Sequence, residues 1–450
     1  IAAPGYNILS ANSNYAADGK LDILMSGTSM ASPFVTGAGA VVQQAFPYLS
    51  AKQIGDVLLS TANNTIEYPR GIVTQIQEDH VADTSQYQLN FFILDSSLNS
   101  LTKEELLKKY EAYLANHVAD GWEKGIKRRI DTWKTQGGSI NVYYNVPLQE
   151  LVGQGVLDVG AAVKGPGALN ARRLTSSDIS NSYTLNGTTG KQALYSIDTQ
   201  GYDSTWSNDI KEIRAGYIAA DSTEADLLAR YNYYNTNWLS YTGTDRDKAK
   251  LTTKTFMDLY NQRVKDSGLA GLSVGLYKAG AGTLALTGTN TYVGSSIAGG
   301  GTLAIDGSVA GDAWSVKNTA AGTTGTISGS GTIKGNLYNH GIVQPSTAGN
   351  LTINGTLTSD GTLGLVMAAG GQSSRQLVIG GAANINGSTL QSVTGSSYLP
   401  DKSYTFLTVA GGITGSLTNT TGSAFTGLLN VKNLNVGGTS GAVTLGLGNN

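Results

Sequence analysis

Apolar positions near the start of the chain predict a short strand followed by a helix. The stretch from Leu21 to Met25 is apolar enough for a strand and ends before Gly27, where glycine permits a sharp turn. Thr28 or Ser29 can then begin a helix whose apolar residues continue to Phe46. Only glycine and alanine occupy positions 37–40, which favours a buried helix packed tightly into a core.

Two capping boxes predict further helices. Ser50 and Gln53 begin one that runs to about Ala62, and Thr102 and Glu105 begin another. The apolar face of this second helix consists of Leu106, Leu107, Tyr110, Tyr113, Leu114 and His117, and a third helix carries Trp122, Ile126, Ile130 and Trp133. We expect residues 63–147 to be an insertion built on this helical hairpin. It is either a structural decoration or a lid or exosite beside a substrate cleft.

A different pattern begins near residue 270. Short segments alternate Leu or Ile with Thr, Ala or Ser, and glycine or asparagine bounds each of them, as at 283–286, 302–305 and 351–353. Such a strand cannot bury its apolar row alone, so we expect the strands to stack as a parallel β-solenoid with glycines at its corners. About 20 residues per turn would give roughly nine turns and a rod near 40 Å long.

Charge density divides the chain into three regions. Charged side chains are dense between residues 101 and 131 and almost vanish beyond residue 270. We expect a first domain over 1–165, a connecting segment with helices over 166–269 and the repeats over 270–450. In the connecting segment, a helix with an aromatic stripe is expected between 224 and 265. The stripe, which we interpret as helix packing rather than a sugar site, consists of Tyr231, Tyr233, Tyr234 and Trp238.

Composition narrows the possible classes of protein. Charged residues make up 14 % of the 450 residues and glycine contributes 59, which is typical of a repetitive extracellular chain. A net charge of −2 provides no field for nucleic acid or anionic membrane. There is no cysteine for disulfides, and no apolar stretch is long enough to cross a membrane as a helix.

Ser29 is the candidate for chemistry. A serine at the start of a helix has two interpretations: it caps the helix, or it is a nucleophile whose backbone N–H points at a developing oxyanion. Gly-Thr-Ser alone favours the cap, because capping is the commoner role. A nucleophilic serine also needs a base, usually histidine, and the three histidines, His80, His117 and His340, all follow it in sequence.

The segments around Ser29 resemble the serine region of subtilases. These segments are Ile1–Gly5, Ser26–Gly37 and Phe46–Ile54, and Gly153–Val163 is similar to the family's closing strand and helix. The resemblance implies that Ser29 is the nucleophile and that its backbone N–H contributes to the oxyanion hole. It implies no metal ligand that can be placed here, and calcium is expected only because it is common in the family.

The resemblance covers about residues 1–62 and 148–165. In subtilases the catalytic Asp and His and the oxyanion-hole Asn all precede the serine, and none of the three can be matched here. Removing the serine or the histidine of such a triad costs about 10⁶ in turnover. We therefore expect the chain to be a piece of a longer protein, lacking both ends, and to be inactive by itself.

No catalytic role is expected for the nearby aspartates or for the three histidines. Asp18 and Asp22 are expected to be solvated loop carboxylates, because no histidine lies between them and the serine. His117 falls on an apolar helix face as a packing residue, and His80 also lies on the wrong side of the serine. His340 lies within the glycine-rich repeats, where we expect it to be exposed.

The repeats resemble the passenger-associated repeats of bacterial autotransporters. The fold class expected is therefore mixed: a partial α/β subtilisin-like domain followed by a right-handed parallel β-helix. The resemblance implies a serine endopeptidase at the surface of a Gram-negative bacterium, with peptide substrates and a C-terminal translocator β-barrel as partners. The alternative is a non-catalytic adhesin or structural rod with a vestigial protease module.

Overall fold

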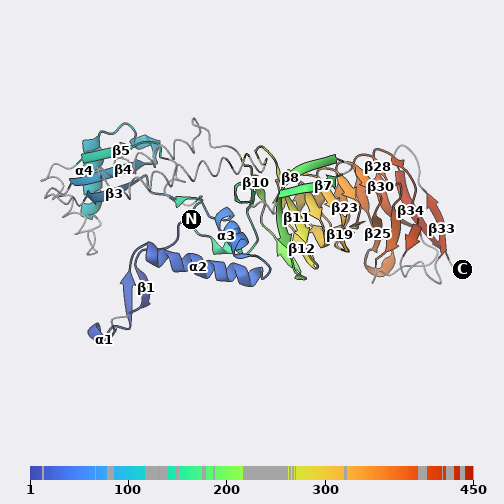
Figure 1. Cartoon of the computed structure of the whole chain (residues 1–450), viewed down its shortest axis with the longest axis horizontal. Helices are drawn as coiled ribbons and strands as arrows, with labels where there is room; N and C mark the ends of the chain where they lie inside the picture. The colour runs from blue at the N-terminus through green and yellow to red at the C-terminus, as the bar shows by residue number, and fades with distance from the viewer. Residues whose placement is uncertain are drawn as a thin grey trace. The chain divides into compact units, whose positions relative to one another are not determined.

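The structure is a computed structural model that describes residues 1–12, 15–65, 67–78, 86–116, 131, 139–146, 152–174, 179–185, 188–215, 262, 265, 268, 270–318, 322–393, 403–417, 419–421, 430–435 and 441–448. Two compact units make up the chain (Figure 1). The first contains residues 1–2, 63–156 and 218–257, and the second contains residues 3–62, 157–217 and 258–450.

The first unit contains a three-stranded sheet packed against one helix. Strands β3 (Gly71–Glu78), β4 (Gln86–Ile93) and β5 (Ser139–Tyr143) lie in that order, with β4 antiparallel to β3 and parallel to β5. After the short turn η1 (Ser96–Leu98), α4 (Lys103–Asn116) follows. Alternate residues of β4, namely Leu89, Phe91 and Ile93, form the core with Leu106 of α4.

We had expected a helical insertion, but it also contains this three-stranded sheet. The first predicted helix is confirmed, and its capping box forms: the Thr102 N–H donates to Glu105 Oε2 at 2.8 Å and the Glu105 N–H to Thr102 Oγ1 at 3.3 Å. The second, expected at 122–133, lies outside the described residues except for Asp131, which is helical and exposed. The sheet was missed because the partners of β4 come from both sides of α4, a pairing that no local pattern indicates.

The second unit begins with a hairpin and two helices. Strands β1 (Ile8–Ala11) and β2 (Asp22–Met25) pair antiparallel and flank the short helix α1 (Tyr15–Asp18). Helices α2 (Thr28–Ala45) and α3 (Ala51–Ser60) follow, which confirms the predicted strand and both helices. The capping box of α3 is also present, with the Ser50 side chain accepting from the Gln53 N–H.

The prediction that α2 is buried is wrong for the described structure. Only Ala38 and Val42 of this helix are buried, while Phe34 and Val41 are each 42 % exposed. Among the described elements, the helix packs chiefly against α3 and α7 (Val159–Ala162). A Cβ added at Gly37 would meet no atom within 4 Å, so close packing does not explain that glycine.

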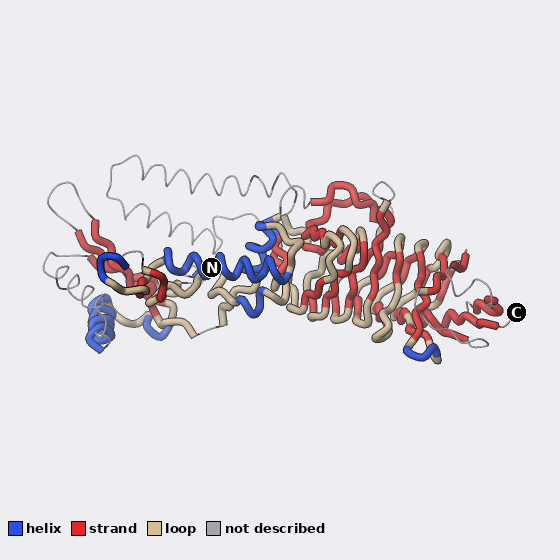
Figure 2. The backbone as a smooth tube through the Cα atoms, turned by 90° about the horizontal axis from the view of Figure 1, so that it is seen from below, coloured by secondary structure: helices blue, strands red, loops and turns tan. Residues whose placement is uncertain are grey.

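Most of the remaining described residues of the second unit form three sheets that the chain visits in rotation (Figure 2). The first sheet contains β7 (Ile179–Leu185), β8 (Thr188–Asp198), β11 (Val274–Ala279), β14 (Ser296–Ala298), β17 (Ala313–Ser315), β21 (Leu337–Asn339), β24 (Leu357–Ser359), β28 (Ala383–Asn384) and β31 (Ile413–Thr414). The second contains β9 (Ser204–Trp206), β12 (Thr283–Leu286), β15 (Gly301–Ile305), β19 (Thr323–Ser328), β22 (Ile342–Val343), β25 (Thr362–Met367), β29 (Thr389–Ser392) and β32 (Asn419–Thr421), with β18 (Lys317–Asn318) and β26 (Ser374–Arg375) alongside. The third contains β13 (Thr289–Asn290), β16 (Ser308–Val309), β20 (Thr332–Ile333), β23 (Leu351–Ile353), β27 (Leu377–Ile379), β30 (Ser403–Val409), β34 (Gly441–Gly448) and β33 (Asn430–Asn435).

Successive strands within each sheet are parallel, apart from the pairs β7–β8, β30–β34 and β33–β34 and the two side strands. We call three consecutive strands, one from each sheet, a layer. The same inward position is aliphatic in layer after layer, so that one row runs through the second sheet. Its members, each fully buried, are Leu284, Leu303, Ile327, Val343, Leu363 and Leu390. Burial of each such side chain is worth roughly 1.5–3 kcal/mol, which makes this row a main source of stability.

One corner of the layers shows why glycine recurs in the repeats. Gly288, Gly307 and Gly331 follow one another in successive layers, and a Cβ at Gly307 would lie 2.1 Å from the Gly288 carbonyl oxygen. At Gly331 the corresponding distance to the Gly307 oxygen is 2.0 Å. Any side chain at these positions would push the layers apart.

The stacking starts before the predicted repeats. Strand β8 pairs with β11, and β9 pairs with β12, so residues 188–206 supply part of the first layer. Next to this layer lie α3, α7, β6 (Ala168–Asn170) and η2 (Ala171–Arg173), and β6 pairs in parallel with β10 (Lys211–Ile213). The helix predicted between 224 and 265, with its aromatic stripe, lies outside the described residues except for Gln262 and Lys265.

Candidate active site around Ser29

Ser29 is the second residue of α2, and glycines shape the turn that leads to it. Gly27 is the N-cap residue with φ 153°, a conformation that L side chains rarely adopt. Its N–H donates to the Gly5 carbonyl at 2.7 Å, which joins the first residues of the unit to the start of the helix. A Cβ at Gly5 would lie 2.8 Å from the Gly27 oxygen, so the close approach requires glycine at position 5, whereas the positive φ favours glycine at position 27.

The first turn of α2 leaves the Ser29 amide available. The Gly27 carbonyl accepts from the Met30 N–H at 3.1 Å and from the Ala31 N–H at 3.2 Å. The amide of Ser29 lies one position earlier, among the N–H groups that have no carbonyl partner within a helix. Its side chain is exposed. The positive end of the helix dipole adds to this arrangement, so the site can stabilise a negative oxygen next to the serine.

A second contact holds the segment beside the helix start. The Asn7 N–H donates to Ser26 Oγ at 2.9 Å, and Asn7 itself has φ 49°. Asp22 is exposed, as expected, but the prediction that the two aspartates lie in a loop is wrong: Asp22 begins strand β2 and Asp18 is the last residue of helix α1.

The structure brings no histidine to Ser29 among the residues that it describes. His80 and His117 lie outside those residues. His340 is only partly exposed, with 32 % of its side chain accessible, because it forms a 2.8 Å contact with Asp360 and stacks beside Trp314 at 6.1 Å between ring centroids. It therefore lies at the surface of the first sheet, more covered by its neighbours than the exposed position that we expected.

The described part of the chain contains no cluster of side chains suited to bind calcium. No group of three or more acidic or imidazole side chains there is arranged to hold a metal ion. Within the same residues, no helix is long and apolar enough to cross a membrane. No step of the chemistry is assigned to a metal.

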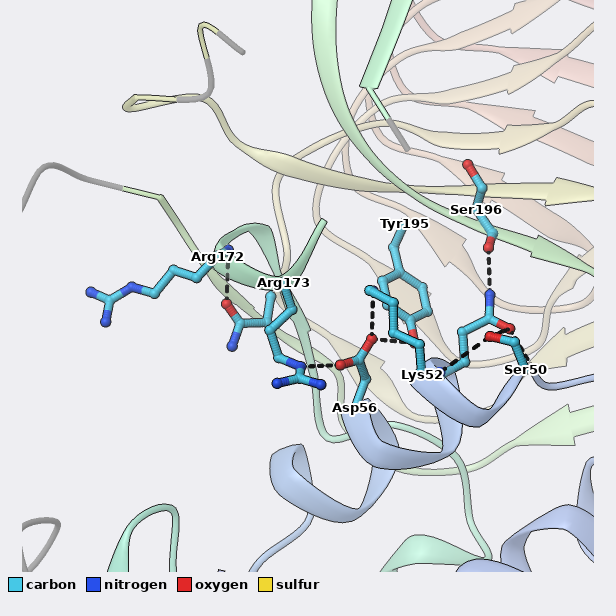
Figure 3. A network of polar contacts seen from close by, with 9 residues as sticks. Ser50, Lys52, Asp56, Arg172, Arg173, Tyr195 and Ser196 are labelled. Carbon is cyan, nitrogen blue, oxygen red and sulfur yellow. Dashed lines mark hydrogen bonds and ion pairs between the residues drawn. The ribbon is translucent and has the colours of Figure 1, made fainter. Parts of the chain in front are cut away.

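Helix α3, which packs against the helix that carries Ser29, has a buried carboxylate that the sequence did not reveal. Asp56 of α3 is 5 % exposed and accepts from Lys52, Arg173 and Tyr195 (Figure 3). The signal that could have found it is the pair Lys52–Asp56, four residues apart on one helix. Arg173 and Tyr195 are too far away in sequence for any local pattern to connect them.

The comparisons with known proteins relate the first part of the chain to one family of proteases. Residues 1–88 match the subtilase family. The chain is also similar to an extracellular serine protease of Serratia marcescens, with 26 % identity over 406 residues. That similarity covers 88 % of this chain and 26 % of the Serratia protein. The chain thus spans about a quarter of the length of the curated relative that it matches, and its N-terminal segment is related to the subtilases.

Proposed function

We propose that this chain is part of a serine endopeptidase of the subtilase type, secreted or displayed at the cell surface, with Ser29 as its nucleophile. The observation that carries the proposal is the position of Ser29. It lies in the first turn of α2, after a glycine of positive φ, within the segment that matches the subtilase family. Ser29 Oγ would attack the carbonyl carbon of a peptide bond to form an acyl-enzyme, and the Ser29 N–H would bind the oxyanion.

The base and its orienting acid would come from sequence outside residues 1–450 in this proposal. We therefore propose that residues 1–450 alone do not hydrolyse peptides. The subtilase resemblance supports this, because in that family both groups precede the serine. None of His80, His117 and His340 is proposed as the base, because all three follow the serine in sequence.

The three-sheet region is proposed to be a right-handed parallel β-helix of the autotransporter passenger type. Support comes from the rotation of the chain among the sheets and from a repeat near 20 residues, such as the pairing of Leu276 with Ser296. The extracellular location named for the Serratia relative supports secretion or surface display. The autotransporter assignment itself rests on the resemblance of the repeats. The role of residues 63–147 as a decoration or a lid remains a prediction.

Labelling with a fluorophosphonate tests the catalytic proposal. The complete protein should be labelled, and Ser29→Ala should abolish the label, whereas Ser32→Ala, on the same exposed part of α2, should retain it. Residues 1–450 alone should not react. Labelling that survives in Ser29→Ala would refute the assignment. A folded complete protein that takes no label would favour the alternative, a surface rod or adhesin with a vestigial protease module.

A further inference from the structure

We propose that the first strand layer braces the helix that carries Ser29, through a joint centred on Asp56. The joint consists of Tyr48, Gln53 and Asp56 on the side of α3, and Arg173, Tyr195, Ser196 and Ser204 on the side of the strands. By this inference, α3 both supports α2 and caps the layered sheets. Order at Ser29 therefore depends on the folding of strands far from it. The effect of the joint on the reactivity of Ser29 rests on the proposed function, whereas its effect on the order of α2 does not.

Asp56 is the electrostatic centre of the joint. Its carboxylate is almost completely buried and accepts from Lys52 Nζ at 3.0 Å, from Arg173 Nε and from the Tyr195 hydroxyl at 3.4 Å (Figure 3). Arg173 ends η2, and Tyr195 lies on β8. A buried carboxylate is tolerated only when such donors satisfy it, so separating α3 from the strands would leave a charge without partners.

Two further side chains join α3 and its N-terminal turn to the strands. The Gln53 carboxamide accepts from the Ser50 N–H at 2.9 Å in the capping box and donates to the Ser196 carbonyl of β8, also at 2.9 Å. The hydroxyl of the buried Tyr48 donates to Ser204 Oγ of β9 at 2.9 Å. Gln53 thus caps the helix and also binds the first sheet, so the N-terminal turn of α3 is linked to the first layer.

The segment after α7 covers the same end of the layers. Trp206 of β9 is 1 % exposed, and a Cβ at Gly165 would lie 2.7 Å from its ring. The Asn208 side chain donates to the carbonyls of Ala161 at 2.9 Å and Gly165 at 2.5 Å. Strand layers need such a cover, because an open end exposes apolar side chains and invites association.

The position of α2 makes this joint relevant to Ser29. Within the described residues α2 packs against α3 and α7, and its other face is open. The end of α2 is tied down by Phe46, which is 3 % exposed, and by Tyr48, two residues further on. Within the described residues, α3 is thus the element that contacts both α2 and the first strand layer.

Native-state hydrogen exchange of the unaltered chain is the primary test. We expect amides in residues 38–45 of α2 and in α3 to open together with those of β8, β9 and β11, with the same dependence on denaturant concentration. If α2 and α3 instead exchange through a separate opening that is insensitive to denaturant while the strands stay protected, the brace does not exist.

Variants test the joint from both sides. Asp56→Ala and, in the second layer, Leu276→Ala should each speed exchange in α2 about tenfold or more, although neither residue is on α2. Arg173→Met should act like Asp56→Ala, and Arg173→Lys should restore most of the protection. The matched control is Asp22→Ala, an exposed carboxylate outside the joint, which should leave these rates unchanged. An unchanged α2 in both Asp56→Ala and Leu276→Ala would overturn the proposal.

A labelling arm separates this inference from the proposed function. In the complete protein, Asp56→Ala should slow fluorophosphonate labelling of Ser29 in parallel with the loss of α2 protection. If Ser29 is never labelled, the catalytic proposal fails while the exchange results still decide the brace. If labelling is normal although α2 has lost protection, the proposed dependence of Ser29 on the joint is wrong.

Discussion

Replacement of Lys278 by methionine, followed across alkaline pH, tests how the layers tolerate a buried charge. Lys278 lies on β11 and is fully buried. Its ammonium donates to the carbonyls of Gly280 and Gly282, both at 2.7 Å, and of Gly300 at 2.9 Å. The first two belong to the turn between β11 and β12, and the third precedes β15, so the ammonium links two layers. Methionine has a similar length but donates no hydrogen bond.

Two opposing contributions set the magnitude. The Gly282 oxygen also accepts from the Thr302 N–H at 3.0 Å, so within the described residues the methionine variant orphans the carbonyls of Gly280 and Gly300. The buried Gly300 carbonyl costs about 1–3 kcal/mol when it is unsatisfied, and the half-buried Gly280 carbonyl costs less because water can reach it. Burial, however, lowers the pKa of Lys278 from 10.5 to about 8, because the loss of hydration outweighs the attraction of nearby aspartates.

The lowered pKa gives the pH dependence a definite sign. Between about pH 8 and 10.5 the unfolded chain holds a proton on Lys278 that the folded chain has released, so stability due to this group rises with pH. At about 1.4 kcal/mol per pKa unit, the lowering from 10.5 to about 8 gives a gain of at most about 3.5 kcal/mol. Lys278→Met lacks the group, so the unaltered chain should gain up to this amount over the variant between pH 7 and 10.5.

Urea unfolding at several pH values measures the difference in free energy of unfolding between the two proteins. Taking the difference cancels the titration of all other groups. The matched control is Lys334→Met, at an exposed lysine of the same region, which should change the free energy by less than about 0.5 kcal/mol. An advantage of the unaltered chain that shrinks with rising pH would refute the reasoning. It would mean that the carbonyl oxygens stabilise the ammonium more than burial destabilises it.

Two more substitutions probe the interior and the capped end. Asn339→Ala should lower the free energy of unfolding by about 2–4 kcal/mol in chemical denaturation, because Asn339 is fully buried and donates to Ser359 Oγ at 2.8 Å; a loss under 1 kcal/mol would contradict this. Gly165→Ala should cost about 2–4 kcal/mol, because Gly165 has φ 98° and the new Cβ would meet Trp206. Gly201→Ala, with φ 88° and nothing within 4 Å, isolates the backbone cost, so equal losses at the two glycines would exclude the steric contribution.

Features written in short stretches of sequence were predictable. The helices beginning after Ser50 and Thr102 were found because each capping box lies within four residues. The alternating segments beyond residue 270 were recognised as strands because alternation places one row of side chains inward. The position of Ser29 after a glycine at a helix start was predicted, and the structure puts it there. Its role as nucleophile came from the resemblance to subtilases and stays a prediction.

Features that depend on distant partners were not predictable. Strand β8 pairs Ala193 with Val274, and nothing in the intervening sequence indicates that pairing. Asp56 had one visible partner, Lys52, but Arg173 and Tyr195 join it only through the fold. The exposed face of α2 was not predicted either. Apolar spacing shows which face of a helix can be buried, but it does not show whether a neighbour covers that face.

The intrinsic weakness of α2 connects these observations to the proposed chemistry. Gly37 and Gly39 each cost a helix about 1 kcal/mol relative to alanine, and Pro33 lies in its early turns. A helix of this composition is marginal by itself, so its order must come from packing. A Cβ at Gly39 would lie 3.7 Å from Ile54 of α3, which places that packing on the helix that also holds the first strand layer. The Ser29 amide can bind an oxyanion only while the first turn of α2 is formed. We therefore expect substitutions that free α3 from the strands to impair the site at Ser29 before they unfold the layers.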